Sequence, residues 1–305
     1  MSVDSVLTVK GSRPELLPLA VNAPIGYVGN QILPMAKIAG KAGTVYAATL
    51  VADSAKQTSR SAGAAPSATT LAENPISVST KEYIKRYQMP WEAVPLFGGV
   101  ENSDVYAAKA AKRSVENAIE TLQLATLVDG AGTSITSAIV DGIIDGCDQV
   151  HRYTGKFAFV TSVGQYRWMM QQTEIKNLLV RFFSGGLEAM DSLSLSKTAF
   201  KNMLQALFGI EEVLIADDKF WPYAYRTTSA VVKIPNSNDM SFISEPEYGR
   251  LFCYWPTDAG EYEINSFPYE ANRANVFDAT AWLDPQQFNS GAKALLTLNT
   301  SGSTT

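Results

Sequence analysis

The first third of the chain alternates between extended apolar segments and a stretch too poor in hydrophobic residues to form a core. Residues 44–51 are β-branched and aromatic, which predicts a strand. Residues 54–70 are almost entirely Ser, Ala, Thr and Gly, and residues 76–89 are extended again. The apolar phase changes near Lys81 and Glu82, which predicts a bulge or bend. The pattern predicts a long two-stranded projection, which needs another surface to lie on because an isolated hairpin is marginally stable in water.

One long helix is predicted after this projection, from about Ser103 to Asp129. Asn102 and Ser103 are suitable N-caps, and Gly130 and Gly132 are expected to end the helix. Its apolar residues recur at intervals of three and four and form one narrow stripe: Val105, Ala108, Ala111, Val115, Ala118, Ile119, Leu122 and Ala125. Val105, Val115, Ile119 and Leu122 are the expected packing residues, and Lys112, off the stripe, is expected to matter little for folding. At ~1.5 Å per residue the helix is roughly 40 Å long.

Residues 1–42 contain several prolines and glycines that interrupt any helix. Short apolar pieces remain, such as residues 32–35. The segment is therefore predicted to be an extended arm with occasional hydrophobic anchors, and a disordered tail is the alternative.

Strands alternate with amphipathic helices in the second half of the chain, which predicts a compact α/β domain. Residues 157–161 are expected to form a buried strand, and a helix after Ser196 is expected to end at Gly209. Residues 262–268 and 275–282 are predicted to be closing strands.

Composition changes this picture in three ways. Charged residues make up 18% of the 305 residues, which is below the ~25% typical of soluble domains. Low charge fits a surface covered by other subunits, although a mildly polar monomer explains it equally well. The net charge of −5 argues against a free nucleic-acid binder, which would carry a basic stripe. We expect no membrane span and no signal peptide, because long apolar runs and a basic start are missing.

Candidate catalytic chemistry is sparse. His151 is the only histidine, so a two-histidine metal site is impossible and a Ser–His–Asp triad would depend on this residue. Phosphate-binding glycine motifs are missing. Asp141, Asp145 and Asp148 could bring carboxylates together, but a solvated surface is the preferred interpretation. Cys147 and Cys253 lack metal-ligand spacing and are expected to be free thiols. We expect no catalytic residue, no metal and no cofactor.

The order of these parts resembles the major capsid proteins of tailed bacteriophages, whose shell fold has phage Hong Kong 97 as its archetype. The most similar stretches are residues 79–84, which lead toward Val94 and Pro95, and residues 204–213, a helix that feeds a strand. Residues 60–63 stand where many members carry an Arg- and Gly-rich loop tip. The resemblance covers nearly the whole chain. A long charged scaffolding domain and a fused protease, which some members carry, are not seen in the sequence.

The resemblance implies an α+β phage major capsid fold with an N-terminal arm, an extended β-hairpin called the E-loop, a long spine helix in a P-domain, and an α/β A-domain. It implies the following division: arm 1–42, E-loop 43–94, first part of the P-domain 95–154, A-domain 155–260, and P-domain return strands with the C-terminal tail 261–305. Within the E-loop, the candidates for contacts with another subunit are Lys56, Arg60, Tyr83 and Tyr87.

The function implied is that of a structural protein that self-assembles into the icosahedral head of a tailed bacteriophage and encloses double-stranded DNA. The expected partners are copies of the same chain in pentamers and hexamers, and packaged DNA bound without sequence specificity. A scaffolding protein, a portal and decoration proteins are further candidates. The expected location is the virion, and the host cytoplasm during assembly. The alternatives are an encapsulin-like protein compartment and a cytosolic α/β enzyme.

Overall fold

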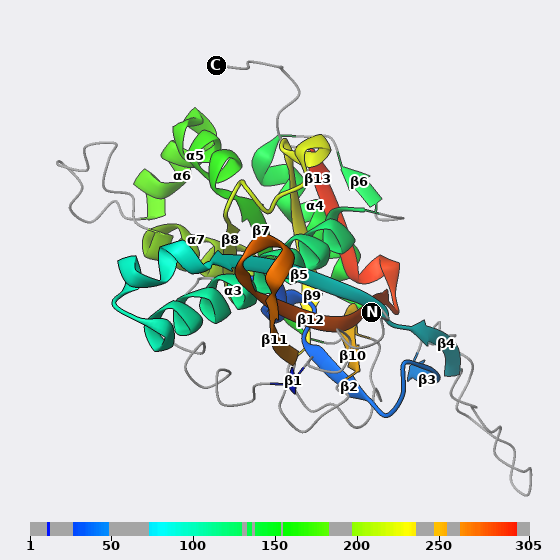
Figure 1. The fold of residues 1–305 in the computed structure, drawn as a ribbon. Coiled ribbons are helices and arrows are strands. Elements are labelled where there is room, and N and C mark those ends of the chain that lie inside the picture. The colour runs from blue at the N-terminus through cyan, green and yellow to red at the C-terminus, as the bar shows by residue number, and fades with distance from the viewer. Residues whose placement is uncertain are drawn as a thin grey trace, which may run out of the picture.

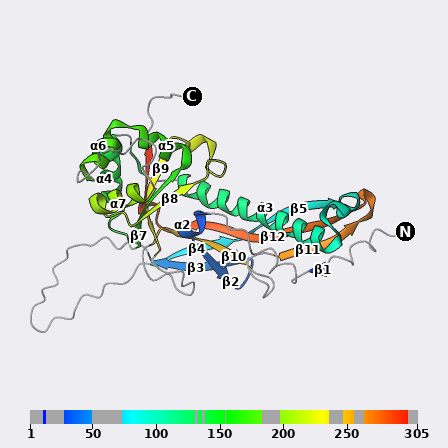
Figure 2. The ribbon, with the colours of Figure 1, turned by 90° about the vertical axis from the view of Figure 1, so that its left-hand side faces the viewer.

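The computed structural model describes residues 11–12, 27–48, 73–129, 133–135, 138–153, 155–182, 197–235, 247–254 and 263–297. These residues form an elongated lobe, built on a long helix and a six-stranded sheet, and a rounder lobe with a five-stranded sheet and several helices (Figures 1 and 2). The described helices include none with both the length and the apolar character needed to cross a bilayer.

The six-stranded sheet is organised around its longest strand, β12 (Ala274–Gln287). Its antiparallel neighbours are β11 (Glu263–Tyr269), β10 (Gly249–Tyr254) and β5 (Lys81–Pro90). The outer strands are β1 (Gly11–Ser12), which pairs with β11, and β2 (Met35–Ile38), which runs parallel to β10. A short turn, η5 (Glu270–Asn272), joins β11 to β12. Strands far apart in sequence therefore share one sheet.

Helix α3 (Val100–Val128) lies along this sheet and packs on β5 and β12 (Figure 2). Its 29 residues agree closely with the helix expected from about Ser103 to Asp129. The predicted N-cap is wrong, because Gly99 occupies the cap position without a side-chain hydrogen bond. Ser103 lies within the first turn, where its hydroxyl donates to the carbonyl oxygen of Val100. A 3₁₀ segment, η3 (Trp91–Phe97), connects β5 to α3.

The five-stranded sheet has the order β6–β13–β9–β7–β8. Its strands are β6 (Thr133–Ile135), β13 (Lys293–Thr297), β9 (Thr228–Ile234), β7 (Lys156–Ser162) and β8 (Glu212–Ala216). The helices of this lobe are α4 (Ile139–Val150), α5 (Val163–Gln171), α6 (Thr173–Phe182) and α7 (Lys197–Phe208). Two short 3₁₀ turns, η4 (Tyr223–Tyr225) and η6 (Ser290–Ala292), precede β9 and β13.

The two faces of this sheet serve different cores. Phe159 and Val231 are cross-strand partners that belong to the core formed with the helices. Ala158 and Val232, the adjacent pair, belong to a larger core that also contains Leu124 of α3. Successive side chains of a strand point to opposite faces, so the sheet separates the helices from the end of α3. The end of α3 is thereby built into both lobes.

Two strands lie in a different sheet from the one that the expected division implies. β10 falls within the segment expected as the A-domain, 155–260, yet it pairs with β12 in the six-stranded sheet. β13 falls within the segment expected as P-domain return strands, 261–305, yet it pairs with β9 and β6 in the five-stranded sheet. The chain therefore crosses between the lobes more often than the expected boundaries allow.

The projection begins as an antiparallel hairpin of β3 (Ala42–Ala48) and β4 (Glu73–Ser79), with its base formed by the pair Ala42 and Ser79. The extended segment is interrupted at Thr80, beside the position where a bulge or bend is predicted, and continues as β5 in the six-stranded sheet. The E-loop range expected from sequence, 43–94, therefore includes a strand that belongs to the body. The candidates Lys56 and Arg60 lie outside the described residues.

Candidate functional site

The buried face of α3 changes direction along the helix. In its N-terminal half Ala107, Ala108, Ala111 and Val115 are buried, at the spacing that the sequence predicts. Ser103, Asp104 and Lys112 are buried in this half too, and the C-terminal half buries Ile119, Glu120, Gln123, Leu124, Leu127 and Val128. The four expected packing residues divide accordingly, with Val115 and Ile119 buried and Val105 and Leu122 half-buried.

Lys112 departs from its expected exposure. Its side chain is buried, and its ammonium group lies 3.3 Å from the Glu116 carboxylate one turn later. A lysine can bury its methylene stem while its charged end remains paired. The expectation that Lys112 contributes little to folding is therefore not supported by its position.

Glu120 fastens the segment before β2 to α3. The backbone N–H groups of Val28 and Gly29, at the start of the short helix α2 (Gly29–Ile32), donate to its two carboxylate oxygens at 3.0 and 2.9 Å. Burial raises the pKa of Glu120, while the two N–H bonds act in the opposite direction. The carboxylate is 2% exposed, so these bonds replace the water that it would otherwise bind.

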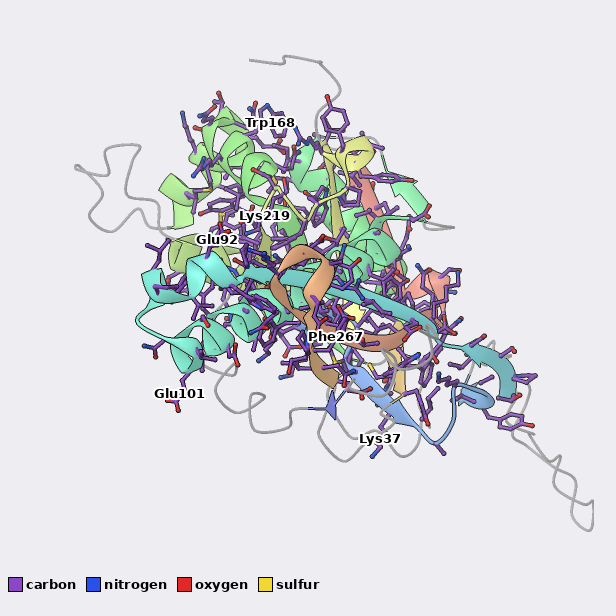
Figure 3. All side chains as sticks on the ribbon, viewed as in Figure 1. Lys37, Glu92, Glu101, Trp168, Lys219 and Phe267 are labelled. Carbon is purple, nitrogen blue, oxygen red and sulfur yellow. The ribbon has the colours of Figure 1, made fainter. Side chains whose placement is uncertain are left out.

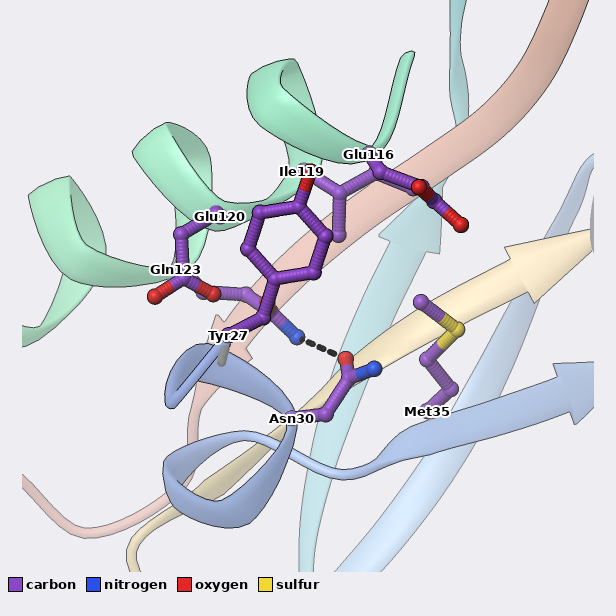
Figure 4. A pocket seen from close by; sticks show the side chains of 7 residues that line it. All are labelled: Tyr27, Asn30, Met35, Glu116, Ile119, Glu120 and Gln123. Atoms are coloured by element: carbon purple, nitrogen blue, oxygen red, sulfur yellow. Dashed lines mark hydrogen bonds between the residues drawn. The ribbon is translucent and has the colours of Figure 1, made fainter. Parts of the chain in front are cut away.

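Gln123 makes the second attachment. Its Nε2 donates to Asn30 Oδ1 at 2.8 Å (Figure 4) and to the carbonyl oxygen of Leu33 at 2.9 Å. The hydroxyl of Tyr27 donates to Asn117 Oδ1 at 2.8 Å, and burial raises the pKa of Tyr27 to about 12. A polar pocket of about 70 Å³ lies here, lined by Tyr27, Asn30, Met35, Glu116, Ile119, Glu120 and Gln123. The N-terminal segment is thus held on the helix by directional bonds as well as apolar contact.

The C-terminal end of α3 is capped by side chains from both lobes. Lys293 of β13 donates to the carbonyl oxygens of Leu127 and Asp129 at 2.7 and 2.5 Å. Gln287 and Tyr248 both donate to the carbonyl oxygen of Thr126, Tyr248 at 3.2 Å. Burial lowers the pKa of Lys293 to about 8. These bonds satisfy carbonyls that a helix end leaves without partners.

Tyr83 and Tyr87 occupy a different place from the one expected. Both lie on β5, beyond the hairpin, and pack against the main core of their own chain. The ring of Tyr87 meets that of Tyr106 on α3 edge-to-face, with centroids 6.1 Å apart. Both side chains are half-buried. Contact of either residue with another subunit stays a prediction.

Large apolar side chains are exposed around η3 and the first turns of α3. Leu96 is 84% exposed and Val100 58% exposed, and Trp91 and Tyr106 are also exposed. Glu101 projects outward from the first turn of α3 (Figure 3). Exposed apolar groups that lie together are typical of protein contact surfaces. This stretch, which we term the η3 surface, is a candidate contact that the sequence reasoning did not identify.

The residues weighed for catalysis do not form a site. Asp141, Asp145 and Asp148 are exposed on α4, and His151 is exposed at its end, beside the carbonyl oxygen of Asp148. Among the described residues, no cluster of three or more His, Cys, Asp or Glu side chains could hold a metal ion. Burial raises the pKa of Cys147 to about 11, which leaves its thiol protonated and poorly nucleophilic at neutral pH.

No protein family model matches the sequence, and no curated protein matches it. Solved structures match over most of the chain. A phage-related protein from Bordetella bronchiseptica RB50 superposes with a TM-score of 0.67 at 12% identity, covering 95% of this chain and 97% of that chain. The capsid structure of the cyanophage P-SCSP1u gives a TM-score of 0.58 at 9% identity, covering 92% and 91%. The chain has the fold of a phage capsid protein.

The shell fold predicted from the order of the sequence elements is thereby confirmed. The encapsulin SrpI from Synechococcus elongatus PCC 7942, in its holo complex, has the same fold, with a TM-score of 0.54, 9% identity, and 87% and 85% of the two chains covered. Identities this low show likeness of fold alone. The same fold therefore occurs in a phage capsid and in an encapsulin, and the fold alone does not fix a function.

Proposed function

We propose that this protein is a major capsid protein, a structural subunit that self-assembles into the icosahedral head of a tailed bacteriophage and encloses double-stranded DNA. One observation carries the proposal: the likeness to the phage-related protein and to the cyanophage capsid covers 95% and 92% of this chain, which is too much to be confined to one lobe. A likeness confined to one lobe would fit many α/β proteins. The elongated lobe with its hairpin has the form of a subunit that lies on its neighbours.

The subunits would meet through heterologous contacts that close around symmetry axes. In this proposal the β3–β4 hairpin of one copy lies across α3 and β5 of a neighbour, with Lys56 and Arg60 near its tip. The arm, residues 1–42, straps a second neighbour, and the lobe within 155–260 meets its copies in pentamers and hexamers. The exposed η3 surface and the exposure of most of β5 support this reading, because both offer area for contacts.

DNA would be enclosed without sequence-specific binding, which is compatible with a net charge of −5. A separate scaffolding protein, a portal and decoration proteins are proposed partners. The virion would be the final location and the host cytoplasm the place of assembly. We assign the chain no enzymatic activity, since its lone histidine is exposed and Cys147 is held as a thiol.

The test is assembly of the full chain after expression in a bacterial host. Sedimentation and negative-stain microscopy should reveal closed shells of uniform diameter. Shells purified from infected or induced cells should contain nuclease-protected double-stranded DNA. Absence of shells built from this chain in infected or induced cells would contradict the proposal.

An encapsulin-like compartment is the second candidate, favoured by the match to the encapsulin shell. Such shells should form from this chain alone and enclose a protein cargo in place of nuclease-protected DNA. Mass spectrometry of the contents of native particles separates the two candidates.

A further inference from the structure

The hairpin is joined to the body at one residue on its C-terminal side. β4 ends at Ser79 and β5 begins at Lys81, so Thr80 alone separates a strand of the hairpin from a strand of the six-stranded sheet. The pairing of β5 with β12 ends where Lys81 meets Leu283. Asp284, the next residue of β12, lies where that pairing would otherwise continue.

At this point the side chain of Asp284 accepts hydrogen bonds in place of the backbone. Its Oδ2 accepts the backbone N–H of Ser79 at 2.7 Å and the amide of Gln286 at 2.9 Å. A carboxylate thus replaces the carbonyl that a continued ladder would offer, and a hydrogen bond to a charged acceptor is stronger than one to a neutral one. Thr80 turns away, because its N–H and its hydroxyl both donate to the carbonyl oxygen of Lys41 at 2.9 Å. The strand therefore leaves the sheet here.

The N-terminal strand of the hairpin, β3, is also held by a residue of β12. The ammonium group of Lys41, just before β3, lies 4.8 Å from the ring centroid of Trp282. Trp282 stands two residues before Asp284, so the two side chains point to the same face of β12. The ring of Tyr254 on β10 meets Trp282 edge-to-face at 6.2 Å and fixes its position. Both legs are therefore fastened to one short stretch of one strand.

The described part of the hairpin also rests on a small apolar core. Val78 is buried there with Ala36, Phe252 and Phe288, and the half-buried Val45 and Ile76 of the hairpin pack against it, apart from the two large cores of the lobes. Tyr46 on β3 is exposed. A small core tolerates tilting more readily than a large one, so polar contacts at the base contribute to the direction in which the hairpin projects.

We propose that Asp284 and Trp282 form a clamp that sets the direction of the β3–β4 hairpin and, through it, the angle at which neighbouring copies meet. This inference rests on the proposed function, in which the hairpin lies on a neighbour. Asp284 is a positioning residue: it holds one leg by an acceptor bond, and Trp282 holds the other through Lys41. Releasing the clamp should leave the subunit folded and change the curvature of the assembly.

The test variant is Asp284→Ala. Asp284→Asn keeps an acceptor for the N–H of Ser79. Asp145→Ala is the control, because it removes an exposed acid on α4, which belongs to the other lobe. Hydrogen exchange of residues 73–79 should rise by roughly tenfold in Asp284→Ala, because a hydrogen bond to a charged group is lost. The melting temperature should stay near that of the wild type. Electron microscopy should reveal a broader distribution of shell diameters, and Asp284→Asn, whose neutral amide oxygen is a weaker acceptor, should restore both readouts in part.

Failure of the inference and failure of the proposed function are distinguishable. A wild-type chain that never forms shells overturns the function, while hydrogen exchange still tests the clamp. Wild-type exchange and wild-type diameters in Asp284→Ala overturn the clamp. If Asp284→Ala does not fold, the variant Lys41→Gln, at an exposed residue, takes its place. Faster hydrogen exchange in residues 42–48 together with altered shell diameters supports the clamp. Unchanged hydrogen exchange and unchanged diameters overturn it.

Discussion

The ammonium group of Lys293 lies 2.7 Å from the carbonyl oxygen of Leu127, so a lysine from the five-stranded sheet caps the helix that runs along the other sheet. A cation at the C-terminal end of a helix is favoured by the helix dipole and by the unpaired carbonyls there. Lys293 is 1% exposed, and Gln287 of β12 binds the same turn. The end of α3 is therefore a joint at which side chains from both sheets meet.

Replacing Lys293 with methionine should weaken this joint. The substitution keeps the length of the side chain and removes its donors to Leu127 and Asp129. We expect the free energy of unfolding to fall by about 1–3 kcal/mol, the cost of leaving a buried carbonyl without a partner. Lys156→Met, at an exposed position of β7, is the matched control and should change stability by less than about 0.5 kcal/mol. Urea unfolding measures both, and equal effects would contradict the cap.

The same residue should make stability depend on alkaline pH. Burial lowers the pKa of Lys293 from 10.5 to about 8, and Asp129 opposes this shift. Between these values the unfolded chain keeps a proton that the folded chain has released. Stability therefore rises with pH through this window, and the contribution of Lys293 is lowest below about pH 8. The stability difference between wild type and Lys293→Met should grow from about pH 7 to about pH 10, and a constant difference would rule out the shift.

Gly29 tests the attachment of the N-terminal segment to α3. A methyl group at this position would overlap Gln123 Oε1 and lie 2.7 Å from Glu120 Oε2. Gly29→Ala should therefore displace both side chains and lower the free energy of unfolding by about 1–3 kcal/mol. Gly43→Ala is the control, because no atom lies within 4 Å of the added methyl. If Gly29→Ala is as stable as Gly43→Ala in thermal unfolding, the segment does not depend on these bonds.

The parts of the fold that sequence reasoning found are those with a strong local period. α3 is recognisable because its apolar positions repeat at helical spacing over many turns. The second half of its buried face is not, because Glu120 and Gln123 look like solvated residues until their partners are known. Those partners lie about 90 residues earlier in the chain: Val28 and Gly29 for Glu120, with a sequence separation of 92 and 91.

The sequence also could not show which sheet each strand belongs to. The residue pattern did not single out β13 as a strand, and for β10 the choice of sheet depends on pairing with residues far away in sequence. The same pairing decides that Tyr83 and Tyr87 lie on a strand of the body, while their contact with another subunit stays a prediction. The bend near Lys81 is visible in the alternation of the sequence, but only pairing with β12 reveals that the chain beyond the bend belongs to the body. The η3 surface has no periodic signal at all.

The η3 surface should matter for assembly and little for folding. Leu96 is 84% exposed in the subunit, so replacing it with glutamine removes almost no buried area. We expect the melting temperature of Leu96→Gln to match that of the wild type, while the yield of shells falls because a partner loses an apolar contact. Sedimentation velocity measures the assembled fraction. Tyr223→Gln, at a residue of η4 that is 79% exposed, is the comparison in the other lobe.

Removing residues 55–68 tests the hairpin as an element that acts between subunits. This segment is rich in Ser, Ala, Thr and Gly and contributes little apolar area to any core. The base of the hairpin, with Ala42 paired to Ser79, would be retained. We expect a soluble subunit with the circular dichroism and melting temperature of the wild type that no longer closes shells, because its reach across a neighbour is lost. Normal particles from the shortened chain, seen by electron microscopy, would show that the hairpin tip is not an assembly element. Loss of the folded subunit would instead show that the tip supports its own chain.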